Sequence, residues 1–231
     1  MSFDPRNQSP FNALPPVVVA LAVVIAGIEL MFQAGASGLV GGPEAVGWRL
    51  NAVRDWSVYD PVFAWMFETG QVPPRELARL VTYPLIHLSF GHAAFAAVFV
   101  LAFGNVLSPF YPAWRFLLIF WGAALAGAVA FVALFSTGQR LTGAYAGAYG
   151  LIGAFAYVSR KGLTRVDPDR AFLLIGLLLA IQPIFGLASG SGLGWMPDWI
   201  AEMSGAAAGF GLAALLFPGG TARLRDRLRQ R

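Results

Sequence analysis

The chain contains no cysteine, only two histidines and few charged residues. The absence of cysteine excludes disulfides, thiolate nucleophiles and cysteine-based metal sites. The two histidines, His87 and His92, are too few for a site built on three. Charged residues make up 12% of the 231 residues, against about 25% in a typical soluble domain. This shortage of charge argues against a water-soluble protein.

Hydrophobic residues make up 57% of the chain, which is more than a soluble protein of this size can bury. A membrane-spanning helix needs about 20 mostly apolar residues. Six segments come close to this: 17–32, 80–107, 113–135, 143–158, 171–188 and 199–217. We therefore expect an all-α polytopic membrane protein, a bundle of six transmembrane helices. The fourth segment is short and rich in Gly and Ala, which predicts a helix buried among the others.

The chain divides into three parts by composition. Residues 1–16 form an N-terminal segment, 17–217 the membrane domain and 218–231 a basic tail. Ala34-Gly35-Ala36 resembles a signal-peptide cleavage site. However, the apolar run before it is longer than a typical h-region, and the N-terminal segment has no positive excess. We expect a retained helix.

The basic residues predict the orientation in the membrane. With both termini in the cytoplasm, most of the 16 basic residues fall on the inner side, as the positive-inside rule requires. Those inner residues are Arg6, Arg115, Arg160, Lys161, Arg165, Arg170, Arg223, Arg225, Arg227, Arg229 and Arg231. The net charge of +4 thus reflects topology, and no recognition module for nucleic acid is present. The expected location is an inner (plasma) membrane of bacterial type, where the tail can contact anionic lipid.

The longest stretch outside the six segments is the first external loop, about residues 33–79. Trp and Tyr favour the headgroup region, so an interface-lying or re-entrant element is expected, with a folded external loop as the alternative. The aromatic residues are Trp48, Trp56, Tyr59, Phe63, Trp65 and Phe67. Small residues four apart, Gly143/Gly147 and Gly205/Gly209, favour close packing of the fourth and sixth helices.

Several motifs occur in a fixed order along the second half of the chain. One runs from Arg79 to His92 and has two His five residues apart. A Phe-Gly-Asn sequence follows at 103–105. The stretch Gly143-Ala-Tyr145-Ala-Gly-Ala-Tyr-Gly150-Leu-Ile-Gly-Ala lies in the fourth segment, and Ala-Glu202-Met-Ser-Gly205 with Gly209 lies in the sixth. Together these resemble the rhomboid intramembrane proteases. The resemblance implies a rhomboid-like six-helix fold with a long first external loop.

The chain departs from the rhomboid pattern at the residues that carry the chemistry. Tyr145 occupies the position of the family's serine nucleophile, and Glu202 that of its histidine base. Ala96 replaces the asparagine that helps to hold the oxyanion. The family positions that remain are His87, His92, Gly143, Gly150, Gly205 and Gly209.

These replacements remove the parts of a serine protease. A phenol has an ordinary pKa of about 10, and the ring of Tyr145 fills the space that a scissile carbonyl needs. A carboxylate such as Glu202 shuttles a proton poorly to a leaving amine. Loss of one oxyanion donor at Ala96 lowers the rate by about 10²–10³. We predict no catalytic residues, no cofactor and no metal site.

Three serines elsewhere in the chain are alternative candidates for a nucleophile. Ser189-Gly190-Ser191-Gly192 has no His nearby in the sequence and is interpreted as a flexible turn. Ser204 lies two residues after Glu202 and so does not share its helix face.

We expect Tyr145 and Glu202 to face each other, with the phenol donating to the carboxylate. The alternative is that Glu202 is neutral, or paired with His87 or His92. Such a pair either staples two helices in a retired active site or serves client binding. Glu29, late in the first segment, is expected near the outer surface, with a water-filled site as the alternative. On a continuous helix His87 and His92 would lie about 140° apart, which disfavours joint metal binding.

The leading interpretation is a catalytically inactive rhomboid-like protein that binds transmembrane helices or other membrane proteins. By family analogy it acts as a scaffold, escort or assembly and quality-control factor. The alternative is a rhomboid-type serine endopeptidase with divergent residues. A transporter or channel subunit would need more polar residues along a continuous path and an inverted repeat.

Overall fold

The computed structural model describes residues 14–164, 168–188, 190 and 192–218. Helices dominate, and one short antiparallel strand pair joins two loops. In chain order the elements are α1 (Pro16–Ala36), η2 (Pro43–Gly47), α2 (Trp48–Trp56), β1 (Val58–Tyr59), α3 (Asp60–Thr69), α4 (Pro74–Thr82), η3 (Tyr83–Leu85), α5 (Phe90–Leu107), α6 (Ala113–Leu134), β2 (Arg140–Leu141), α7 (Tyr145–Arg160), α8 (Pro168–Ala188) and α9 (Met196–Leu216).

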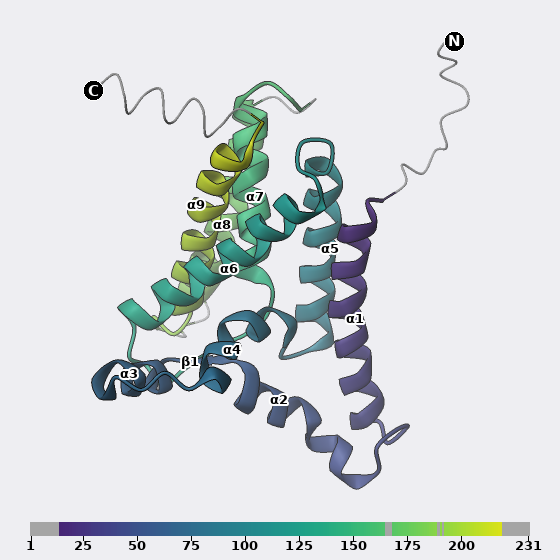
Figure 1. The fold of residues 1–231 in the computed structure, drawn as a ribbon, viewed down its shortest axis with the longest axis vertical. Helices are drawn as coiled ribbons and strands as arrows, with labels where there is room; N and C mark the ends of the chain where they lie inside the picture. The colour runs from purple at the N-terminus through teal and green to yellow at the C-terminus, as the bar shows by residue number, and fades with distance from the viewer. Residues whose placement is uncertain (1–13, 165–167, 189, 191, 219–231) are drawn as a thin grey trace.

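The long helices form a bundle, and the short elements lie at one end of it (Figure 1). Helices α1 and α5 run side by side, while α6, α7 and α9 pack against one another. Helices α2, α3 and α4 lie at the end of the bundle opposite the beginning of α1 and the end of α9. The chain is thus an all-α polytopic membrane protein whose first long connection is folded into short helices.

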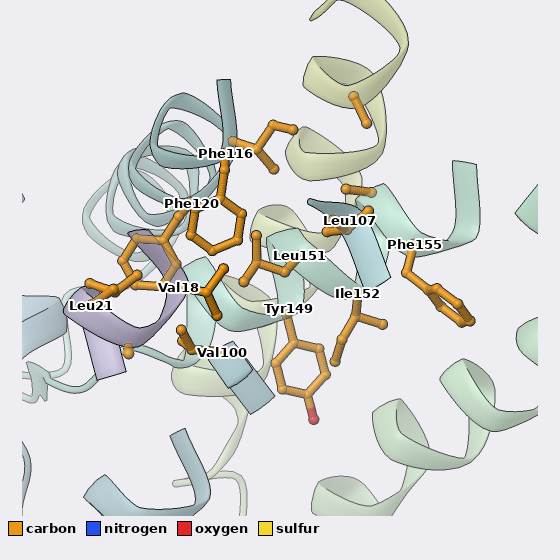
Figure 2. Close-up of a cluster of buried hydrophobic side chains, with 14 of the residues drawn as sticks. Val18, Leu21, Val100, Leu107, Phe116, Phe120, Tyr149, Leu151, Ile152 and Phe155 are labelled. Atoms are coloured by element: carbon orange, nitrogen blue, oxygen red, sulfur yellow. The ribbon is translucent and has the colours of Figure 1, made fainter. Parts of the chain in front are cut away.

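Helix α7 is the centre of the bundle, as its Gly- and Ala-rich composition predicts. Every residue from Ala146 to Ser159 is buried. Leu151, Ile152 and Phe155 of α7 belong to one buried cluster with Phe116 and Phe120 of α6 (Figure 2). In a membrane, where lipid is as apolar as these side chains, close packing holds such a helix in place.

Glycines bring α7 and α9 into backbone contact. A Cβ on Gly205 would lie 2.2 Å from the Ala146 carbonyl oxygen, and one on Gly209 would lie 2.0 Å from that of Gly150. The predicted packing of these two helices is therefore confirmed. Gly147 has a different role than expected, because it faces the Phe120 ring on α6 instead of α9.

The second long helix begins later than the sequence suggested, at Phe90 instead of residue 80. Pro84 lies in the 3-10 turn η3, and Ile86 after it is extended, so the helical pattern is broken there. Ser89 then caps α5, since its hydroxyl accepts a hydrogen bond from the His92 backbone N–H at 3.2 Å. His87 consequently lies in an extended loop and His92 in the first turn of α5.

Four of the described helices are long and apolar enough to cross a membrane: α1, α5, α6 and α9. Helix α7 has 16 residues, and the apolar part of α8 is Ile175–Ala188. A count of six crossings therefore stays a prediction.

Candidate functional site

Gly143 positions the start of α7, where the sequence placed the degenerate nucleophile. It has a φ of +85°, a conformation that glycine adopts without strain. Its N–H donates to the Tyr83 carbonyl at 3.0 Å, and a Cβ would lie 2.8 Å from Cε1 of His92. Only glycine lets the chain pass this close to His92 and turn into α7.

Tyr145 lies flat against His92. The two rings are stacked with centroids 4.7 Å apart and an interplanar angle of 15°. The Tyr145 hydroxyl donates to the backbone carbonyl of His92 at 3.2 Å. The expected hydrogen bond from this phenol to Glu202 is therefore wrong, because the hydroxyl points to the first turn of α5 instead.

Glu202 on α9 receives its hydrogen bonds from α8. Nε2 of Gln182 lies 2.7 Å from both carboxylate oxygens. Glu202 is 5% exposed, and in the part of the chain that the structure describes it has no ion-pair partner. The sequence analysis missed Gln182, although a lone amide in an apolar helix is a detectable signal.

The two histidines meet although they belong to different elements. Their ring centroids are 5.3 Å apart in an edge-on arrangement. Nε2 of His87 accepts from the Ala144 N–H at 3.2 Å, and Nδ1 of His92 accepts from the Leu88 N–H at 3.3 Å. The angular argument against joint use fails because residues 87–92 are not one helix. However, Nε2 of His87 and Nδ1 of His92 already accept hydrogen bonds from backbone N–H groups, so these two nitrogens are not available to bind a metal. Within the described residues no group of three His, Asp or Glu side chains could hold a metal ion.

A cavity of about 590 Å³ joins these groups. His92 of α5, Tyr145 of α7, Gln182 of α8 and Glu202 of α9 all line it. Leu88, Ile181 and Phe185 line the cavity and are exposed, so its mouth opens between the start of α5 and α8. Tyr145 and Glu202 thus face one space, as expected, without bonding to each other.

The other sites proposed from the sequence lie away from this cavity. Ala96 is fully buried on α5, and its methyl group offers no hydrogen-bond donor. Ser204 is partly buried and does not line the cavity. Ser189 and Ser191 lie outside the described residues. Gly150, Gly205 and Gly209 serve helix packing.

Glu29 is buried within the protein, beside α2 of the first external loop. It is 2% exposed and pairs with Arg49, whose Nη2 lies 2.7 Å from Oε1 and whose Nη1 lies 2.8 Å from Oε2. Arg49 Nη1 also donates to the His87 carbonyl at 2.8 Å, and Gln33 donates to Glu29 at 2.8 Å. This cluster ties α1 and α2 to the loop that carries His87.

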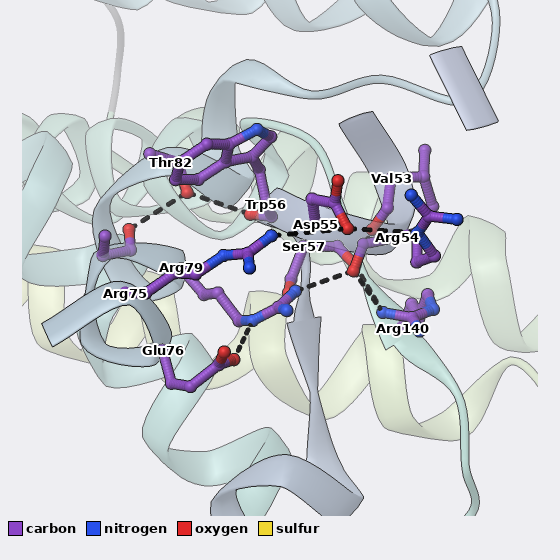
Figure 3. A network of polar contacts seen from close by, with 11 residues as sticks. Val53, Arg54, Asp55, Trp56, Ser57, Arg75, Glu76, Arg79, Thr82 and Arg140 are labelled. Atoms are coloured by element: carbon purple, nitrogen blue, oxygen red, sulfur yellow. Dashed lines mark hydrogen bonds and ion pairs between the residues drawn. The ribbon is translucent and has the colours of Figure 1, made fainter. Parts of the chain in front are cut away.

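A second polar network holds the strand pair beside the cavity (Figure 3). Arg79 Nη1 donates to the carbonyls of Arg54 and Ser57 at 2.8 and 3.0 Å, and Arg140 Nη1 donates to the Arg54 carbonyl at 3.1 Å. These bonds satisfy carbonyls at the C-terminus of α2. Burial lowers the pKa of the Arg140 guanidinium, which lies 4.0 Å over the Tyr59 ring. The network fixes the loop that leads into α7.

Comparison with known proteins supplies the family. No curated protein matches the chain. The family model of the Rhomboid domain matches residues 74–219, which is more than half of the chain and contains α4 to α9 with the whole cavity. The match, together with the buried α7 and its glycine contacts to α9, shows that the chain belongs to the rhomboid family.

Proposed function

We propose that this rhomboid is a non-catalytic membrane protein that binds transmembrane helices, or the segments flanking them, in the cavity beside Tyr145. In this role it acts as a scaffold, escort or assembly and quality-control factor for other membrane proteins. The observation that carries the proposal is the stacking of Tyr145 on His92. The ring occupies the space beside the retained histidine, where an acyl group would have to sit.

Glu202 supports the same conclusion. A general base must lie within hydrogen-bond reach of the proton that it removes. The Tyr145 hydroxyl donates to a backbone carbonyl, and both oxygens of Glu202 are bonded to Gln182. The two residues are therefore not hydrogen-bonded to each other, which supports a non-catalytic role. Ala96 offers no donor to an oxyanion, so the third element of the chemistry is absent as well.

The mouth of the cavity suits a helical client. Its rim residues Leu88, Ile181 and Phe185 are apolar and exposed, and α5 and α8 flank it. Exposed apolar residues at the mouth of a cavity in a membrane bundle are suited to contact with a client helix. The indole N–H of Trp195, also on the wall, is buried without an acceptor among the described residues. A client backbone carbonyl would satisfy it.

The proposed setting is a bacterial inner membrane with both termini in the cytoplasm. The start of α1 and the end of α9 lie at the same end of the bundle, which fits an even number of crossings. Basic residues of the tail then face anionic lipid, at about 1 kcal/mol for each residue near the surface.

The test combines an activity probe with partner capture. The tagged protein is treated with a fluorophosphonate in the membrane, then purified in mild detergent, and its partners are identified by mass spectrometry. We expect no labelling and a discrete set of membrane-protein partners that Ile181→Arg at the rim abolishes. Exposed Val98→Arg on α5, outside the cavity, serves as the matched control. Labelling that survives Tyr145→Phe, and that disappears when one of the serines of the chain is replaced, would favour a divergent endopeptidase instead.

A further inference from the structure

We infer that the cavity selects clients by a cationic side chain, a lysine or arginine within or beside the client's transmembrane helix, which pairs with Glu202. The inference rests on the proposed function, because it names the chemistry of the client that this cavity would bind. It depends on four observations about the cavity: the burial of Glu202, the position of Gln182, the absence of an ion-pair partner for Glu202 among the described residues and the apolar rim.

Glu202 is an acid with no charge partner. It is 5% exposed and lines the cavity, and in the described part of the chain no basic side chain lies within ion-pair distance of it. An ionisable group inside a membrane is costly, and such groups normally pair with one another or mark a binding site. Glu29, the other buried glutamate, has its arginine. The contrast between these two glutamates points to a missing cation at Glu202.

Gln182 marks the place where that cation would bind. Its amide nitrogen lies 2.7 Å from both oxygens of Glu202, which is the position of a nitrogen that bridges a carboxylate. An ammonium or guanidinium nitrogen makes the same contacts with a full positive charge. Gln182 is partly exposed on α8 and has rotatable bonds, so it can turn aside when a client enters.

The one arginine on the described cavity wall is engaged elsewhere. Arg140 donates to the Arg54 carbonyl at 3.1 Å and to Oγ of Ser57 at 3.4 Å, and its guanidinium covers the Tyr59 ring. Asp198 lies one turn before Glu202 on α9 and also lines the cavity, which adds negative charge on the same wall. The interior is therefore complementary to a positive group.

The apolar rim indicates what kind of ligand carries the positive group. Leu88, Ile181 and Phe185 surround the mouth and are exposed, so a free metal ion or a hydrated cation gains nothing from them. The long methylene stem of a lysine or arginine packs on such residues while its head reaches an acid deeper inside. A transmembrane helix with one basic residue combines both features.

Photocrosslinking of a panel of helices tests the inference. Benzoylphenylalanine replaces Phe185 in the full-length protein, reconstituted in vesicles of neutral lipid. Model transmembrane helices of Leu and Ala carry one Lys, Arg, Met or Glu at the same position. We expect the Lys and Arg helices to crosslink about tenfold more efficiently than the Met helix, equivalent to about 1.4 kcal/mol. The Glu helix should crosslink less than the Met helix.

Glu202→Gln is the decisive variant. It should reduce the preference for Lys and Arg to about onefold while the Met helix crosslinks as before; Glu44→Gln, at an exposed residue of η2, is the control. If all helices crosslink equally, or if Glu202→Gln keeps the preference, the inference is wrong but the proposed function stands. If no helix crosslinks, both fail. The comparison of helices on the wild-type protein decides the question even if the variant does not fold.

Discussion

The buried pair of Glu29 and Arg49 gives the sharpest prediction for stability. Arg49→Met keeps much of the side-chain volume but leaves the Glu29 carboxylate, 2% exposed, with only the amide of Gln33. Removing one partner of a fully buried pair costs about 3–5 kcal/mol. Because Arg49 is 20% exposed, we expect about 2–4 kcal/mol of the free energy of unfolding to be lost.

The assay is thermal unfolding in mild detergent, followed by intrinsic fluorescence. A loss of this size should lower the Tm by about 5–15 °C for a chain of this length. The matched control is Arg75→Met, because Arg75 is 63% exposed and approaches Asp55 only to 3.8 Å. An exposed pair of this kind contributes about 0–1 kcal/mol, so the Tm of this variant should barely change.

A double variant separates loss of a pair from loss of packing. In Glu29→Gln combined with Arg49→Met no uncompensated charge remains, so at least half of the lost stability should return. If the double variant is as unstable as Arg49→Met, the charge argument is refuted and Arg49 acts through its contacts alone. If Arg49→Met lowers the Tm no more than Arg75→Met does, the burial argument is refuted as well.

Three further substitutions, the first with a matched control, test the fold by the same unfolding assay. Gly209→Ala places a Cβ 2.0 Å from the Gly150 carbonyl oxygen and should destabilise the protein by about 3 kcal/mol. The control Gly211→Ala places its Cβ in open space and should be neutral or stabilise the protein by up to about 1 kcal/mol. Equal effects of the two substitutions would contradict the packing of α7 against α9. Asp60→Ala removes the acceptor for the N–H groups of Thr137 and Gly138, so we expect a loss of about 1–3 kcal/mol and faster hydrogen exchange at both amides. Tyr83→Phe removes the hydrogen bond that the phenol donates to the Ala124 carbonyl at 2.7 Å and should destabilise by about 1 kcal/mol; an unchanged Tm would show that this bond adds nothing to the helical hydrogen bond of the same carbonyl.

The fold could be predicted well wherever it depends on composition and local pattern. Long apolar runs predicted the helices, and small residues predicted the burial of the fourth helix and its contact with the sixth. The start of α5 was predicted ten residues too early. The apolar pattern continues through Pro84 to residue 90, and only the extended backbone and the Ser89 cap show where the helix begins.

The residues that line the cavity could be predicted better than their hydrogen-bond partners. The order of motifs identified Tyr145, Glu202 and His92, and all three line one cavity. The partners could not be predicted, because they depend on the distance between side chains of separate helices. Gln182 reaches Glu202 from α8, and Arg49 reaches Glu29 from α2. In each pair the two residues are 20 positions apart and lie on separate helices, so no short sequence motif indicates the contact.

The two replaced residues, Tyr145 and Glu202, belong to the closely packed helices α7 and α9 but hydrogen-bond to other partners. Gly205 and Gly209 touch the backbone of Ala146 and Gly150, so the distance between these helices is fixed by main-chain contact. This contact keeps the two helices close, so the directions of the side chains, and not the spacing of the helices, determine which groups Tyr145 and Glu202 contact. The phenol turns to the His92 carbonyl and the carboxylate to Gln182. We therefore expect Glu202, which faces the cavity with only a neutral amide as its partner, to bind a positive group in preference to removing a proton from Tyr145.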